Sequence, residues 1–204
     1  MVASLTPENF INPYTYEEYK TLIYTLAESS SNTGDKSEER VLATKINAQR
    51  IKRIDKQCEL TENLINSIQN FKTDCVWILI TESWCGDGAQ CIPVISKIVE
   101  QSQNIELKLL LRDENLDIID LYLTNGSRSV PKLICLDKNS NEDIGVWGPR
   151  PNEIQKMVLD YKTNNPNSAH DEFVNNLHLW YARDKTQSIQ DEFIDLLNAW
   201  NSKL

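Results

Sequence analysis

The side chain best placed for chemistry in this sequence is the thiol of Cys85. It lies in the segment 81–93, TESWCGDGAQCIP, which follows an apolar, β-branched run and leads into an expected helix. The unpaired N–H groups and the dipole of a helix start stabilise an anion, so a cysteine there has a lowered pKa and more thiolate near neutral pH. We therefore expect nucleophilic thiol chemistry at Cys85.

Two neighbours of this thiol can modify its chemistry. Asp87 would fall in the first helical turn, where its carboxylate either raises the pKa of Cys85 or simply caps the helix. Cys91 is either a second, resolving thiol or a buried residue. Six helical residues rise about 9 Å, whereas a disulfide needs Cα atoms within about 7 Å. A Cys85–Cys91 bond would therefore require the helix start to unwind, which Gly86 and Gly88 make easier.

The remaining cysteines and the histidines give little support for a metal or disulfide site. The five cysteines, at 58, 75, 85, 91 and 135, have irregular spacing, and no pair is separated by two residues. The two histidines, His170 and His178, are eight residues apart. Structural zinc sites need clustered ligands, and disulfide frameworks accompany secretion. We expect no metal, no cofactor and mostly buried thiols, and His178 reads as a surface residue.

Composition excludes several classes of function. The chain has 204 residues, 40% of them hydrophobic, and a net charge of −9, which disfavours nonspecific binding to nucleic acid. Its longest apolar run, residues 76–80, is far too short to span a membrane. The first residues lack the basic start and apolar stretch of a secretory signal. We expect a cytoplasmic protein without nucleic-acid or membrane partners.

One stretch of this acidic chain is basic. Between residues 45 and 56 lie five cations: Lys45, Arg50, Lys52, Arg53 and Lys56. Such a run usually forms a solvated helix face. The alternative is that it approaches Cys85, offsets Asp87 and holds an acidic group of a substrate.

The elements that must position Cys85 follow an α/β order. Helices are expected in the first third, including a long one through about residue 58. Its apolar residues lie partly on one face: Leu42, Ile46, Ile51, Ile54 and Cys58. The middle predicts strands at 75–81, 105–111, 132–136 and 144–147, with helices at 89–101, 115–123 and 151–161. Two further helices carry a repeat of period 20, from Asp171 and from Asp191, which reads as two amphipathic faces packing on the core.

Three motifs together resemble the thioredoxin superfamily. Trp84-Cys85-Gly86 matches the start of its active site, Pro93 falls where the family kinks the following helix, and Ser129-Val130-Pro131 looks like its cis-proline loop. Gly148 resembles the glycine of its last hairpin. More narrowly, the Trp-Cys-Gly-Asp motif is similar to a bacterial thioredoxin-like group with helical extensions.

The resemblance implies a fold and a division of the chain. The fold is α/β, with a mixed central sheet flanked by helices. The expected parts are an N-terminal helical extension at 1–72, a thioredoxin-like core at 73–162, and a C-terminal helical pair at 163–204 that packs on the core.

The resemblance leaves two functions open. One is a thiol–disulfide oxidoreductase acting through Cys85, with or without Cys91, on a protein or low-molecular-weight thiol or disulfide. The other is a non-catalytic protein-binding module that keeps the family's groove. Gly88 stands where the family has its resolving cysteine, and Leu79 where it has a buried acid, which favours the second. The retained motifs favour the first, with substrate contacts expected from Trp84, Gly86, Asp87, Val130 and Pro131.

Overall fold

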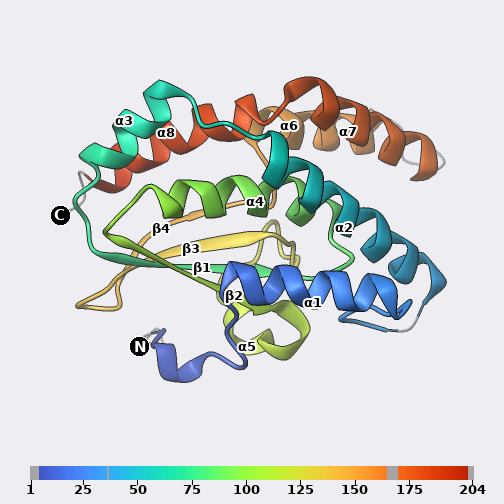
Figure 1. Cartoon of the computed structure of the whole chain (residues 1–204), viewed down its shortest axis with the longest axis horizontal. Coiled ribbons are helices and arrows are strands. Elements are labelled where there is room, and N and C mark those ends of the chain that lie inside the picture. Colours follow the sequence, from blue (N-terminus) through green and yellow to red (C-terminus); the bar gives the residue numbers. More distant parts are fainter. Residues whose placement is uncertain (1–4, 36, 165–169, 202–204) are drawn as a thin grey trace.

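A computed structural model describes residues 5–35, 37–164 and 170–201. Eight α-helices, two 3-10 turns and four strands are found in this part of the chain (Figure 1). The helices are α1 (Tyr16–Glu28), α2 (Glu38–Gln57), α3 (Glu62–Asn70), α4 (Gly86–Glu100), α5 (Leu116–Ile119), α6 (Asn152–Asn164), α7 (His170–Asp184) and α8 (Gln187–Asn201). The strands are β1 (Cys75–Thr81), β2 (Ile105–Leu111), β3 (Lys132–Asp137) and β4 (Asp143–Trp147). The short turns are η1 (Pro7–Asn9) and η2 (Arg112–Glu114).

The four strands form one mixed sheet in the order β2-β1-β3-β4. β1 runs parallel to β2 from Cys75 opposite Ile105 to Thr81 opposite Leu111. β3 is antiparallel to both β1 and β4. The central strand β1 is almost wholly buried, as its continuous apolar sequence predicts for a strand covered on both faces. The expected mixed sheet flanked by helices is confirmed.

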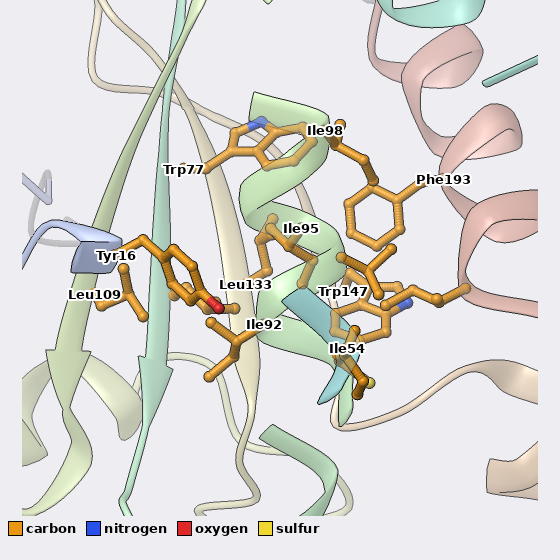
Figure 2. Packing of buried hydrophobic residues seen from close by; sticks show 14 of the residues in the cluster. Tyr16, Ile54, Trp77, Ile92, Ile95, Ile98, Leu109, Leu133, Trp147 and Phe193 are labelled. Carbon is orange, nitrogen blue, oxygen red and sulfur yellow. The ribbon is translucent and has the colours of Figure 1, made fainter. Parts of the chain in front are cut away.

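The main core lies between the sheet and α4, and it extends to α8. Figure 2 shows Trp77 of β1 beside Ile98 of α4 and Phe193 of α8. The ring centroids of Trp77 and Phe193 are 5.5 Å apart, and Trp200 meets Trp77 edge-on at 5.8 Å. A buried aromatic residue truncated to alanine costs about 3–5 kcal/mol, so α8 is an integral part of this core.

The opposite face of the sheet has a smaller cover. Ile78 and Ile80 of β1 point to this face and pack with Ile118 and Ile119 of α5. Leu5, from the segment before α1, joins the same cluster, and α5 lies across the sheet from α4 (Figure 1). The sheet therefore has a thick helical layer on one face and a thin one on the other.

The long helix α2 buries the second half of the apolar face that the sequence predicts, since Ile51, Ile54 and Cys58 are buried, but it does not bury the first half. Leu42 and Ile46 are 59% and 39% exposed, so their expected place on the buried face is wrong. Polar residues replace them: the Asn47 amide donates to the backbone oxygen of Ser83 at 2.8 Å, and Thr44 Oγ1 lies 3.0 Å from Ser83 Oγ. The helix is held by hydrogen bonds to the strand end, which an apolar pattern does not reveal.

The C-terminal helices pack as the repeated pattern predicts in the described residues. Phe193, Leu197 and Trp200 of α8 are buried, and Leu177 of α7 is buried with Trp180 packed against the core. The first repeat begins at Asp171, whose side chain lies outside the described residues. In the part of the chain that the structure describes, we find no helix of the length and apolar character needed to cross a membrane.

Candidate functional site

Cys85 occupies the N-cap of α4, directly after the end of β1. Its Sγ accepts a hydrogen bond from the backbone N–H of Gly88 at 3.3 Å. The thiol in turn donates to the backbone oxygen of Val130 at 3.3 Å. Cys85 is 7% exposed. The thiol thus joins the helix start to the loop before β3.

The loop before β3 lies beside this thiol, with Pro131 immediately ahead of the strand. The Val130–Pro131 peptide bond is cis, as is the bond between Gly148 and Pro149. Gly148 has φ +108°, and a Cβ there would collide with the backbone oxygen of Pro131. A glycine is therefore needed after β4 for the two chain segments to approach each other.

Asp87 is the centre of a buried polar cluster. Its Oδ2 accepts from Nε and Nη2 of Arg150, at 2.9 and 2.5 Å, and its Oδ1 accepts from the Tyr181 hydroxyl at 2.7 Å. Arg150 also donates to Gln155 at 2.9 Å. Charge-assisted bonds of this kind are the strong ones in protein interiors. The cluster ties α4 to the segment after β4 and to α7.

These surroundings set the protonation of the Cys85 thiol. Burial, followed by the Asp87 carboxylate, raises the pKa of Cys85 to about 12, while the Gly88 N–H and the Arg150 guanidinium act in the opposite direction. The expectation of a lowered pKa is therefore wrong, because desolvation outweighs the helix start. The Asp87 carboxylate raises the pKa of Cys85, which is one of the two effects expected of it. The resting thiol is protonated near neutral pH.

Cys91 faces a different part of the molecule. It is 1% exposed, its Sγ lies 4.0 Å from the Tyr181 hydroxyl, and it lines a separate cavity of about 220 Å³ that also borders Cys58. Burial and Asp87 raise its pKa well above the ordinary value. All five cysteines are free thiols, and α4 is helical from Gly86. The structure therefore does not bring Cys91 to the surface that holds Cys85.

Trp84 is covered by the loop between α1 and α2. The guanidinium carbons of Arg40 and Arg112 lie 4.3 and 4.9 Å from its ring centroid. Gly34 of the same loop approaches so closely that a Cβ there would be 3.0 Å from Nε1 of Trp84. The N-terminal part of the chain thus forms one side of the site.

A buried carboxyl group lies three residues before Cys85. Glu82 accepts hydrogen bonds from the Thr33 hydroxyl and from the backbone N–H of Asp113, the latter at 2.8 Å. Its burial is the main reason that its pKa is raised. Glu82 holds the α1–α2 loop and η2 together behind the Trp84-Cys85 segment.

Some basic residues of α2 are exposed to solvent, and one lies close to the candidate site. Lys52, Arg53 and Lys56 are exposed, as a solvated face predicts. Arg50 is the exception: a Cβ on Gly86 would lie 3.3 Å from its Nη1 and 3.6 Å from Cε1 of His178.

His178 is half-buried rather than at the surface. Its Nδ1 has no hydrogen-bond partner among the described residues. Burial and the Arg50 charge lower its pKa to about 4, so the imidazole is neutral near pH 7.

A groove of about 300 Å³ opens beside the thiol. Its described lining comprises residues 84–87, residues 128–130, Arg112 and Arg150. Of the predicted site residues, the groove brings together Trp84, Cys85, Gly86, Asp87 and Val130, with Pro131 next in the chain. Sequence reasoning missed Arg112, Arg150 and Tyr181, because each is brought to Cys85 only by the tertiary fold. The described residues contain no group of three or more potential metal ligands.

Comparison with known proteins agrees with the fold. A sequence model of the family described as Thioredoxin matches residues 34–165, and the chain belongs to that family. The search of curated proteins returned no match.

Among solved structures, a Pseudomonas aeruginosa protein of unknown function is similar over 91% of this chain and 98% of its own, with a TM-score of 0.58 and 14% identity. An HIV epitope scaffold has the same coverage, a TM-score of 0.53 and 15% identity. At these identities the likeness shows the fold alone. Trichomonas vaginalis thioredoxin is 22% identical over 51% of this chain and 93% of its own, with a TM-score of 0.32.

Proposed function

We propose that this thioredoxin-family protein is a thiol–disulfide exchange protein that acts through Cys85 alone. The observation that carries the proposal is the position of the Cys85 sulfur. It accepts from the Gly88 N–H at the start of α4, contacts the Val130 carbonyl, and borders an open groove. A thiolate formed there gains the helix-start N–H groups as hydrogen-bond donors.

The proposed reaction begins with loss of the Cys85 proton. The thiolate attacks one sulfur of a disulfide, a new S–S bond forms to Cys85, and the other half leaves as a thiolate that takes up a proton. A second thiol from solution then attacks the mixed disulfide and regenerates Cys85. Position 88 carries Gly88, so the second thiol comes from outside the chain rather than from the helix.

A second function has its own support. Burial of Cys85 and its pKa of about 12 leave little thiolate near neutral pH, which favours a protein-binding module that keeps the groove without the chemistry. The two functions differ in one measurable property, the ability of Cys85 to form a mixed disulfide.

The deciding experiment is mixed-disulfide formation followed by peptide mapping. The reduced protein is treated with a neutral aromatic disulfide at about pH 8, and the adduct is located by mass spectrometry. Exchange through Cys85 gives one adduct, on the peptide that carries Cys85, and Cys85→Ala abolishes it. Labelling that favours Cys58 or Cys135 in the folded protein would reject the proposal. Release of the adduct by added low-molecular-weight thiol would show the second half-reaction.

A further inference from the structure

The groove beside Cys85 is rich in arginine in an acidic protein. Three arginines line it, Arg112, Arg128 and Arg150, against one carboxylate among its described lining residues, that of Asp87. Arg112 and Arg128 also have carboxylate partners, but these lie outside the lining of the groove. The N–H donors that these guanidinium groups keep can bind an anionic ligand beside the thiol.

The arginines are held in place by contacts outside the groove. Arg128 pairs with Asp120 through two bonds of 2.6 and 2.7 Å. Arg112 donates to Asp113 at 2.8 Å and to the backbone oxygen of Arg128 at 3.4 Å, and its guanidinium stacks on Trp84. These two aspartates do not line the groove. Guanidinium groups fixed in this way lose little conformational freedom when they bind a ligand.

The arginines keep capacity for a ligand. A guanidinium carries five N–H donors. The described contacts of Arg112 use its Nε, one N–H of Nη1 and one N–H of Nη2. Arg150 uses as many donors, but its carboxylate partner Asp87 itself lines the groove, so the charge of Arg150 is already matched there. Arg112 and Arg128 are therefore the groups able to receive an anionic group in the groove.

The size of the groove restricts the ligand. Its volume of about 300 Å³ is at the lower end for small-molecule pockets. The α1–α2 loop packs on Trp84, and Tyr181 of α7 hydrogen-bonds to Asp87, so two of the lining residues are held in place by segments outside the groove. A planar carboxylate matches the fork of a guanidinium, and Trp84 and Val130 offer apolar surface to the rest of the ligand.

We propose that this groove selects small disulfides and thiols that carry carboxylate groups, with Arg112 and Arg128 binding the carboxylate while Cys85 exchanges with the sulfur. The proposal rests on the exchange function of Cys85. The bond changes are those of simple exchange: the Cys85 thiolate displaces one half of the disulfide as a thiolate, which is then protonated. A second carboxylate-bearing thiol breaks the mixed disulfide and returns Cys85 to the thiol.

The test compares two chromogenic aromatic disulfides that differ in charge. Dithiobis-nitrobenzoate carries two carboxylates and dithiodipyridine carries none. For Arg112→Gln and Arg128→Gln, we expect the rate at Cys85 to fall about tenfold with the anionic reagent, the loss of one charge-assisted hydrogen bond. With the neutral reagent we expect a change of less than about twofold. Lys138→Gln removes an exposed cation that follows the far end of β3 and should alter neither rate.

The outcomes separate the two proposals. Unchanged anionic rates in both arginine variants, or equal losses with both reagents, overturn anion selection while leaving exchange at Cys85 intact. Failure of Cys85 to react with either reagent, judged by subtracting the Cys85→Ala background, overturns the exchange function itself. Added salt should slow only the anionic reagent with the wild-type protein.

Discussion

Replacing Asp87 with asparagine should make the Cys85 thiol more acidic. The Asp87 carboxylate is the second cause, after burial, of the pKa of about 12. A neighbouring charge shifts a pKa by about 1–3 units, and Arg150 already offsets part of this one. We therefore expect the pKa of Cys85 to fall by about 1–2 units. Arg150, which already lowers this pKa, would then lack its counter-charge.

The rate gain follows from two opposing factors. At a pH below the pKa, each unit of acidity gives about ten times more thiolate. The intrinsic nucleophilicity falls by about threefold per unit, so the net gain is about threefold per unit. Alkylation of Cys85 by iodoacetamide at about pH 8 should accelerate roughly 3- to 10-fold in Asp87→Asn. The pKa itself is read from the rate as a function of pH, with peptide mapping to isolate Cys85.

The same substitution should lower stability. Breaking a buried ion pair costs about 3–5 kcal/mol of folding free energy. Because an asparagine at position 87 can still accept a hydrogen bond from Arg150, we expect Asp87→Asn to cost about 2–3 kcal/mol. For a chain of this length that loss lowers the Tm by roughly 4–12 °C.

The matched control for Asp87→Asn is Glu106→Gln. It removes a carboxylate from surface ion pairs with Lys108 and Lys138, at the end of the sheet where β1 begins. This variant should leave the pKa of Cys85 unchanged. A pKa in Asp87→Asn equal to or above that of the wild type would refute the electrostatic argument.

Three further predictions concern neighbours of the thiol. A Cβ on Gly88 would lie 2.7 Å from Oγ1 of Thr81, so Gly88→Cys alone should cost about 1–3 kcal/mol, and the pair Gly88→Cys with Thr81→Ala should recover it. That double variant should reduce insulin disulfides faster than the wild type. Unchanged turnover would contradict the idea that the absence of a second thiol limits the rate of disulfide reduction. The pKa of Glu82 is raised in the fold, so the stability linked to its proton is present at low pH and is lost as pH rises through that pKa. Glu82→Gln should therefore raise the Tm near pH 7, with a gain that shrinks as the pH falls through that pKa; a difference in Tm that does not change with pH would contradict this. Cys91→Ser should leave the rate of adduct formation at Cys85 within about twofold, because Cys91 lines another cavity, and a large loss would return it to the mechanism.

Local sequence patterns predict the sheet and the thiol position well. The strand β1 begins and ends where its apolar, β-branched run does, at Cys75–Thr81. A run of this kind and length is typical of a strand covered on both faces. The strand β2 spans Ile105–Leu111, where Glu106 and Lys108 alternate with apolar residues before the apolar run 109–111. The position of Cys85 follows from the same reasoning, since a helix must begin after β1.

The electrostatics of the site could not be predicted in this way. Arg150 and Tyr181 are 63 and 94 residues from Asp87, and only the tertiary fold brings them to it. The N–H groups and dipole of a helix start lower the pKa of an exposed thiol, whereas burial raises the pKa of Cys85. The packing of α2 could not be predicted for a similar reason: Asn47 is buried because its amide donates a hydrogen bond to the backbone oxygen of Ser83, and hydropathy does not indicate such a contact.

The segments outside the sheet constrain the chain around Cys85. The α1–α2 loop covers Trp84, and α7 reaches Asp87 through Tyr181, so both sides of the Cys85 segment are occupied by the chain itself. Gly88 is packed against Thr81, which leaves no room for a second thiol at that turn without repacking. Any resolving thiol must therefore enter by the same groove as the disulfide. A groove lined by Arg112 and Arg128 would then favour a carboxylate on the incoming disulfide and also on the thiol that releases Cys85. Under the proposal, both half-reactions therefore use the same class of small, carboxylate-bearing thiols.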